Sequence, residues 1–453
     1  MMITVSEECV RAGRSLVSAL GVSLLVLLFV GGSSAGVPAG TLSFLGCASA
    51  AARPIVGCSM ANLSSPAALV VSPDGKDVYI TASASDAIEV FGRASDGGIT
   101  PHGCLGNPSD GPHNCNGAYG LKAGAMAISP DGRSIYVAGG GTLTILARDA
   151  NGNIGAAGCI QDLASPGLNC GRAAALTGDD AVAVSPDGTT VYTGSAHSID
   201  WFKRATDGSL TPVGCLYDSY PSPTGCYKAP AVVALKGTTS LAVSPDGKNV
   251  YAGGVAGLSV FDRASNGALY PDSCVSDKHT GTGACRTRAN LELVESLAFS
   301  PDGTMLFAGS NALSAVEEFS RGADGAVTEV RCYGNDGLLL TAPGPANCTK
   351  EPGLVNPWDL AVAGTGNRAT LYVDAVSIVQ GFALGSGGLL TLVGCVAVRP
   401  GTQPPAPANC SPATGFIQPH HLAVAPGGGS LYVGSLGAGD ASGGTVVAFR
   451  RAA

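Results

Sequence analysis

Carboxylate, imidazole and indole side chains occur at one shared position of an internal repeat in this sequence. Each of them stands just before the apolar core of a short predicted strand. The side chains at this position are Asp180, Glu295, Trp358, Asp359, His420 and His421. If the fold brings these positions together, their oxygen and nitrogen donors could hold a divalent cation. An imidazole or carboxylate there could also act as a general base. The alternative interpretation is a hydrated polar rim without a ligand.

The elements that must position these residues are revealed by the cysteines. Fourteen of the fifteen fall into seven pairs, one in each of seven copies of a repeat whose first cysteines recur every 55 to 63 residues. A fixed period of this length indicates a repeat architecture. Zinc sites use closer cysteine spacing with histidines nearby, so disulfides are favoured. The predicted disulfides are Cys47–Cys58, Cys104–Cys115, Cys159–Cys170, Cys215–Cys226, Cys274–Cys285, Cys332–Cys348 and Cys395–Cys410.

The N-terminus has the pattern of an export signal. Two arginines precede an apolar run at 16–30, which is followed by small residues at 31–39. This pattern predicts a signal peptide over residues 1–39. A membrane anchor is the alternative, although the run is shorter than the roughly 20 residues a spanning helix needs. Paired cysteines agree with export because disulfides persist outside the reducing cytosol. We therefore expect a secreted or otherwise extracytoplasmic protein of the cell envelope.

The composition narrows the fold and the partners. The chain has 66 glycines, 28 prolines and 13% charged residues, which is typical of a turn-rich all-β protein. A net charge of −8 argues against nucleic acid as a partner. It also argues against an anionic membrane, so we expect membrane contact only through an uncleaved signal. We expect a monomer.

The fourth repeat shows the unit most clearly. A strand at 240–244 is followed by the turn Pro245-Asp246-Gly247 and by further strands at 250–252 and 258–262. A fourth strand runs to Cys274 after an Asn-Gly hairpin. Four antiparallel strands in each of seven units predict a seven-bladed β-propeller over residues 40–453. A solenoid or a pair of sandwiches is the alternative.

Two repeated residue types have structural explanations. The second strand of each unit carries a tyrosine or, once, Phe307, which we expect in the core between blades. Most units also carry an arginine at the end of the third strand and an aspartate in the turn, while the sixth has Leu384 and Thr365 instead. A structural ion pair explains this arginine and aspartate better than an anion-binding site.

The two ends of the chain predict how the ring closes. The last unit stops at Arg451, after its third strand. Residues 40–47 match the fourth strand of another unit, 208–215. We therefore expect residues 40–47 to form the outer strand of the last blade by pairing with residues 445–450, which removes an exposed edge.

The repeat residues also carry a resemblance. The unit Leu-Ala-Val-Ser-Pro-Asp-Gly-x-x-Val-Tyr, followed by Val-Phe-x-Arg and an Asn-Gly or Asp-Gly turn, resembles the lactonase-like, YVTN-type seven-bladed propellers. That family includes propeller-type 6-phosphogluconolactonases, carboxymuconate cyclases and surface proteins. The segment Gln418-Pro419-His420-His421 is similar to the Pro-His opening of an inner strand in lactonase-like proteins. The resemblance implies a site at the channel mouth.

Two functions are consistent with these features. The first is an exported binding or cell-surface interaction module, whose small-molecule or surface partner the sequence does not name. In it, Asp180, Trp358 and Asp359 would contact the ligand, with a divalent cation as a candidate cofactor. The second is a lactonase or lactonising cyclase in which His420 or His421 acts as the base, assisted by Glu295. Inner-strand starts lack the arginine or lysine that a phosphosugar would need, which favours binding.

Overall fold

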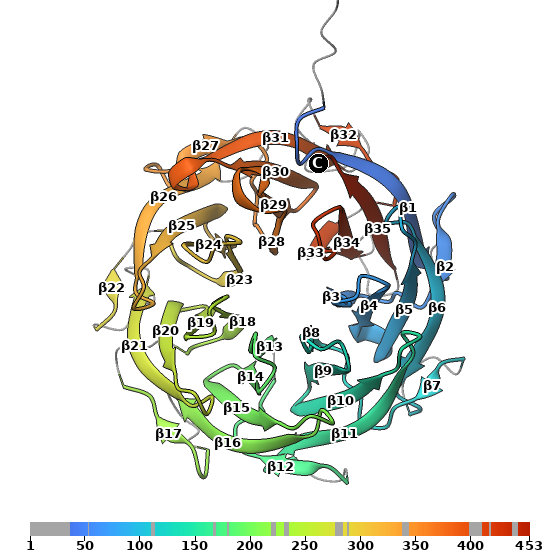
Figure 1. Ribbon diagram of the computed structural model, residues 1–453, viewed down its shortest axis with the longest axis vertical. Helices are drawn as coiled ribbons and strands as arrows, with labels where there is room; N and C mark the ends of the chain where they lie inside the picture. The colour runs from blue at the N-terminus through green and yellow to red at the C-terminus, as the bar shows by residue number, and fades with distance from the viewer. Residues whose placement is uncertain are drawn as a thin grey trace, which may run out of the picture. The chain divides into compact units, whose positions relative to one another are not determined.

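Seven five-stranded sheets are arranged in a ring (Figure 1). This arrangement is seen in a computed structural model, within the unit Pro38–Ala453. Residues 1–36 of the predicted signal peptide lie outside the residues that the structure describes. The structure describes residues 37–453 except for 53, 110–113, 166–168, 179–180, 219–222, 231–234, 277–283, 288–289, 338–343, 398–409, 416–417 and 437–442.

Each sheet is one blade, and its strands run from the axis outward. The inner strands are β3 (Pro66–Val71), β8 (Ala125–Ile128), β13 (Ala181–Val184), β18 (Thr238–Val243), β23 (Val294–Phe299), β28 (Leu360–Ala363) and β33 (Gln418–Val424). The second strands are β4 (Asp77–Ala82), β9 (Ser134–Gly139), β14 (Thr190–Gly194), β19 (Asn249–Gly254), β24 (Met305–Ser310), β29 (Thr370–Ala375) and β34 (Ser430–Leu436). The third strands are β5 (Ala87–Arg93), β10 (Thr142–Arg148), β15 (Ser198–Arg204), β20 (Gly257–Arg263), β25 (Ala315–Arg321), β30 (Ile378–Leu384) and β35 (Gly444–Arg451).

Two further strands complete each blade. The fourth strands are β6 (Ile99–Gly106), β11 (Ile154–Asp162), β16 (Leu210–Tyr217), β21 (Leu269–Ser276), β26 (Val327–Asn335), β31 (Leu390–Ala397) and β1 (Leu42–Ala50). The fifth strands are β7 (Asn116–Gly117), β12 (Gly171–Ala173), β17 (Tyr227–Lys228), β22 (Arg286–Thr287), β27 (Thr349–Glu351), β32 (Ser411–Pro412) and β2 (Ser59–Ala61). The described residues also form three short 3-10 helices, η1 (Ser83–Ser85), η2 (Gly366–Arg368) and η3 (Ser386–Gly388).

The seven-bladed propeller is confirmed, and the number of strands per blade is corrected from four to five. The fifth strand has two or three residues and pairs parallel to the fourth, as in β1 with β2. All seven predicted disulfides form, for example Cys47–Cys58 with a Cα–Cα distance of 4.7 Å. This distance equals the spacing of neighbouring strands, so each disulfide holds the returning chain beside the fourth strand. Seven disulfides indicate that the protein folds in an oxidising environment.

The N-terminal strand closes the ring, as the ends of the chain predict. β1 pairs antiparallel with β35, from Leu42 opposite Arg451 to Ser49 opposite Thr445. The inner strands β33 and β3 are also in contact, so the first and last blades are neighbours (Figure 1). The outer strand is longer than expected, since it extends to Ala50. Among the described residues, no helix is long and apolar enough to cross a membrane.

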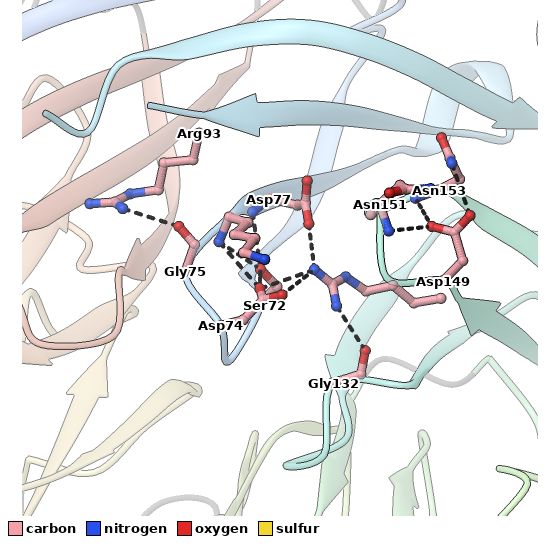
Figure 2. Close-up of polar contacts among 12 residues, drawn as sticks. Ser72, Asp74, Gly75, Asp77, Arg93, Gly132, Asp149, Asn151 and Asn153 are labelled. Atoms are coloured by element: carbon pink, nitrogen blue, oxygen red, sulfur yellow. Dashed lines mark hydrogen bonds and ion pairs between the residues drawn. The ribbon is translucent and has the colours of Figure 1, made fainter. Parts of the chain in front are cut away.

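The turn after each inner strand follows from its sequence. Gly75 adopts a positive φ of 69° and donates its backbone N–H to the carbonyl of Ser72, at 2.8 Å. Glycine adopts this backbone conformation without steric cost. The Ser72 hydroxyl donates to Asp74 Oδ1 at 2.6 Å and accepts the backbone N–H of Asp77 (Figure 2). These bonds fix the Asp74 carboxylate on the surface of the turn.

Four of the predicted arginine–aspartate pairs form, and they connect neighbouring blades rather than residues of one blade. Arg148 of blade 2 pairs with Asp74 of blade 1 and also donates from Nε to the hydroxyl of Tyr79. The Tyr79 hydroxyl in turn donates to the carbonyl of Gly152, in the hairpin that follows Arg148. We call this set of four residues the junction clamp. The other complete clamps contain the pairs Arg204–Asp131, Arg263–Asp187 and Arg321–Asp246.

The tyrosines of the clamps also form the core between blades, as the repeats predict. Tyr79 has no exposed surface and packs with Leu121 and Val137 of blade 2. Fully buried aromatic side chains among the described residues include Tyr79, Tyr136, Tyr192, Tyr251, Tyr372, Tyr432, Phe91, Phe202, Phe261, Phe307, Phe319, Phe382 and Phe449. This apolar core and the clamps hold adjacent blades together.

Candidate functional site

A cavity of about 450 Å³ lies where the inner strands begin, and residues from all seven blades line it. Five of the six predicted site residues are among them. They are Glu295, Trp358, Asp359, His420 and His421. Asp180 lies outside the described residues, although its neighbour Ala181 lines the cavity. The ring therefore gathers these positions around one space, and their chemical roles stay predictions.

The cavity wall is chemically asymmetric. Blades 1 and 2 contribute small or apolar side chains such as Ala68, Leu69 and Met126. Blades 4 to 7 contribute the hydroxyl, carboxyl, indole and imidazole groups. Among the lining residues that the structure describes there is no lysine or arginine. A molecule in the cavity would meet an apolar wall on one side and polar groups on the other.

Asp359 connects three blades. Its Oδ1 accepts the hydroxyl proton of Ser296 in blade 5 at 2.7 Å, and also the backbone N–H of Leu360. Its Oδ2 accepts the backbone N–H of Leu422 in blade 7 at 2.8 Å. Burial raises the pKa of Asp359 to about 6, although these hydrogen bonds oppose the rise. Since both oxygens already have donors, Asp359 holds β33 at Leu422, the residue that follows the two histidines.

A second buried aspartate supports this arrangement, and the sequence analysis missed it. Asp374 in β29 has no exposed surface, and its Oδ1 accepts the backbone N–H groups of Trp358 and Asp359 at 3.1 and 2.5 Å. Burial and the charge of Asp359 raise the pKa of Asp374 well above its ordinary value. A signal existed in the sequence, because the other six second strands have Thr, Ala or Gly two residues after the aromatic residue.

The histidines and the tryptophan form an aromatic group on the cavity wall. The rings of Trp358 and His420 are stacked, with centroids 4.2 Å apart and planes inclined by 24°. The His421 ring lies 6.0 Å from that of His420. Burial lowers the pKa of His420 to about 4. Burial, together with the neighbouring His420, lowers the pKa of His421 to about 3. Both imidazoles are therefore neutral at physiological pH.

Potential metal donors come close together elsewhere in the chain. Among the described residues, three groups have their donor atoms within 4.8 Å of one another, each with one carboxylate and two cysteines. The groups are Glu89 with Cys104 and Cys115, Asp200 with Cys215 and Cys226, and Glu317 with Cys332 and Cys348. The cysteines of each group are joined in a disulfide, so they offer no thiolate. A divalent cation at the channel mouth stays a prediction.

The chain was compared with protein families, curated proteins and solved structures, and the similarities found are mainly similarities of fold. Residues 285–312 match the WD domain, G-beta repeat. A search of curated proteins gives no match. A solved structure of a "putative 6-phosphogluconolactonase" from Bacteroides fragilis aligns with 20% identity and a TM-score of 0.52, covering 75% of this chain and 86% of that chain. The corresponding Bacteroides uniformis structure gives 19% identity and a TM-score of 0.50 over the same shares of both chains.

A solved structure with a different described activity also aligns with the chain. Kuenenia stuttgartiensis hydrazine synthase aligns with 16% identity and a TM-score of 0.50, covering 84% of this chain and 96% of that chain. The chain has the fold of the lactonase-like propellers. The resemblance that the repeats predict is thus confirmed at the level of the fold. Identities of this size show the fold alone, because one propeller can carry unrelated sites.

Proposed function

We propose that the channel mouth binds a small, uncharged organic molecule that carries hydroxyl groups. The observation that carries this proposal is the stacked pair of Trp358 and His420, which lines the same cavity as Glu295. An indole and a neutral imidazole offer a flat apolar surface, while a carboxylate accepts hydroxyl protons. A cavity of about 450 Å³ is also within the usual range for small-molecule sites.

The charge of the cavity supports an uncharged ligand. No arginine or lysine is found among its described lining residues, so a phosphate would meet no cation. Phosphate recognition normally uses such cations or the N-terminus of a helix. We therefore expect phosphosugars to bind more weakly than neutral sugars and lactones. Export to the cell envelope is part of the same proposal, and the seven disulfides support it.

A lactonase is the second candidate, and two observations favour it. The paired histidines line the cavity, and solved structures with this fold include proteins described as 6-phosphogluconolactonases. An efficient general base has a pKa near the working pH. The lowered pKa of His420, about 4, makes it a weak base at neutral pH. We therefore rank binding above catalysis.

A single-tryptophan variant tests the proposal. The chain has only two tryptophans, and Trp201 is buried in another blade, so Trp201→Phe leaves Trp358 as the sole indole reporter. Its fluorescence should change on titration with D-glucono-1,5-lactone or D-glucose and saturate. Adding Glu295→Gln should weaken the affinity by roughly tenfold, the loss of one charge-assisted hydrogen bond. The 6-phosphate of the lactone should bind more weakly than the lactone.

Two outcomes would count against this proposal. A fluorescence that stays constant with all of these compounds would remove the evidence for a ligand site at the mouth. Lactone hydrolysis well above the spontaneous rate, abolished by His420→Ala or His421→Ala with the fold intact, would establish the lactonase instead.

A further inference from the structure

The junction between blades 5 and 6 lacks the clamp found at the complete junctions. Phe307 replaces the clamp tyrosine and has no hydroxyl, and Leu384 replaces the arginine. Met305 stands where the other second strands begin with a polar residue, such as Asn249, whose Oδ1 accepts a hydrogen bond from Arg321 at 2.6 Å. Three positions that contact one another at other junctions have therefore all become apolar here.

One polar member of the clamp remains. Asp302 stands in the turn of blade 5, fixed by the hydroxyl of Ser300 at 2.6 Å and by the backbone N–H of Thr304 at 3.1 Å. The equivalent carboxylates of Asp131 and Asp187 each pair with an arginine of the next blade. Asp302 has no cationic partner within the part of the chain that the structure describes. Its carboxylate is exposed and ready to accept two N–H donors.

A cavity of about 300 Å³ adjoins this carboxylate. Asp302, Met305 and Leu384 line it, together with residues of the two short helices η2 and η3 in blade 6. At a complete junction, the equivalent positions surround the guanidinium group of the clamp arginine. Figure 2 shows one such junction, around the turn that contains Asp74. The cavity thus lies where the missing side chain would be.

A buried carboxyl group lies behind the cavity wall. Glu318 has no exposed surface, and neither of its carboxyl oxygens has a hydrogen-bond partner. Its Oε1 lies against Gly388, where a Cβ atom would collide with it, and Gly388 lines the cavity. The nearest described cation is Arg331, with 3.8 Å between Nη1 and Oε2. The corresponding residues of the other third strands are Val90, Ile145, Trp201, Val260, Gly381 and Ala448.

We propose that this cavity binds the guanidinium group of an arginine side chain from a partner protein, which completes the junction clamp in trans. The complete junctions show that this geometry holds a guanidinium, with the arginine side chains only 5 to 7% exposed. In the Arg148 clamp, Nη2 donates to both oxygens of Asp74 while Nη1 donates to the carbonyl of Gly132, a planar fork that an ammonium group does not present. The net charge of −8 favours a basic partner.

The test uses the intact propeller and two isosteric probes. N-acetyl-arginine amide in excess should raise the melting temperature by about 2 °C, whereas the uncharged N-acetyl-citrulline amide should not. Asp302→Asn should abolish this rise because it removes the charge and keeps the shape of the turn. Leu384→Arg should also abolish it, since the new side chain fills the cavity from within the chain.

A matched control separates this cavity from the channel mouth. Glu295→Gln changes a carboxylate that lines the mouth and not the junction cavity, and it should leave the response to the arginine probe unchanged. Equal responses to both probes, or a response that persists in Asp302→Asn, would overturn the proposal. If Leu384→Arg fails to fold, the melting temperature of Asp302→Asn with the arginine probe decides whether the cavity binds a guanidinium group. Neither result bears on binding at the mouth, which the fluorescence of Trp358 reports.

Discussion

Arg148, at the end of β10 in blade 2, donates from Nε to the hydroxyl of Tyr79 in β4 of blade 1, at 2.7 Å. The same bond joins Arg204 to Tyr136 at 2.7 Å. In both cases the arginine also pairs with an aspartate of the preceding blade. A hydrogen bond and an ion pair therefore connect successive blades at a fixed position of the repeat.

The clamp predicts the effect of removing one arginine. Arg204→Ala should lower the free energy of unfolding by about 2 to 4 kcal/mol, because the buried hydroxyl of Tyr136 and the carboxylate of Asp131 lose the guanidinium group that bonds both. Arg133→Ala is the control, since Arg133 is exposed. Urea denaturation measures both variants. Equal, small effects would show that the clamps contribute little to stability.

The closure of the ring predicts the effect of removing its outer strand. Deleting residues 40–47 in a Cys58→Ser background should cause aggregation or a large drop in melting temperature, because β35 loses its partner. The matched control carries Cys47→Ser and Cys58→Ser and keeps the strand. Size-exclusion chromatography and calorimetry compare the two proteins. A deletion variant as stable as this control would be inconsistent with closure by β1.

Glu318 predicts a dependence of stability on pH. Burial raises its pKa from 4.5 to about 7, and Arg331 partly opposes this shift. Since the folded protein holds this proton more tightly than the unfolded chain, the stabilisation that Glu318 contributes is greatest below pH 4.5. It falls as the pH rises to about 7, by on the order of 3 kcal/mol. Glu318→Gln should remove this part of the profile, while Asp324→Asn, at an exposed site, should not. Identical profiles would argue against a buried ionisable Glu318.

The two buried histidines predict that stability depends on pH in the direction opposite to that of Glu318. Burial lowers the pKa of His420 from 6.5 to about 4, so the folded protein favours the neutral ring. This contribution to stability is complete above pH 6.5 and is lost as the pH falls to about 4. NMR titration of the imidazoles, assigned with His420→Gln and His421→Gln, measures both values. Titration of either ring near pH 6.5 would restore a competent general base and favour the lactonase.

Much of the fold could be predicted from the repeats, because the cysteine spacing and the Ser-Pro-Asp-Gly turn occur in several copies. The fifth strand could not, since a pair such as Asn116–Gly117 is too short to show a period of two. Its pairing depends on the disulfide that holds it beside the fourth strand. Which blade supplies the aspartate of each ion pair was also not predictable, because Arg148 reaches Asp74 only in the assembled ring.

The candidate site was partly predictable in the same way. The shared repeat position places Glu295, Trp358 and the histidines around one cavity. The sequence does not reveal which groups satisfy one another. Asp359 has its oxygens occupied by Ser296, Leu360 and Leu422, and these contacts depend on how blades 5, 6 and 7 pack.

A crystal structure of the protein soaked with D-glucono-1,5-lactone or D-glucose tests ligand binding at the mouth most directly. The account predicts the sugar ring against the Trp358–His420 pair, with a hydroxyl group donating to Glu295. A sugar bound only elsewhere on the propeller, or a mouth that stays free of ligand at saturating concentration, would contradict it.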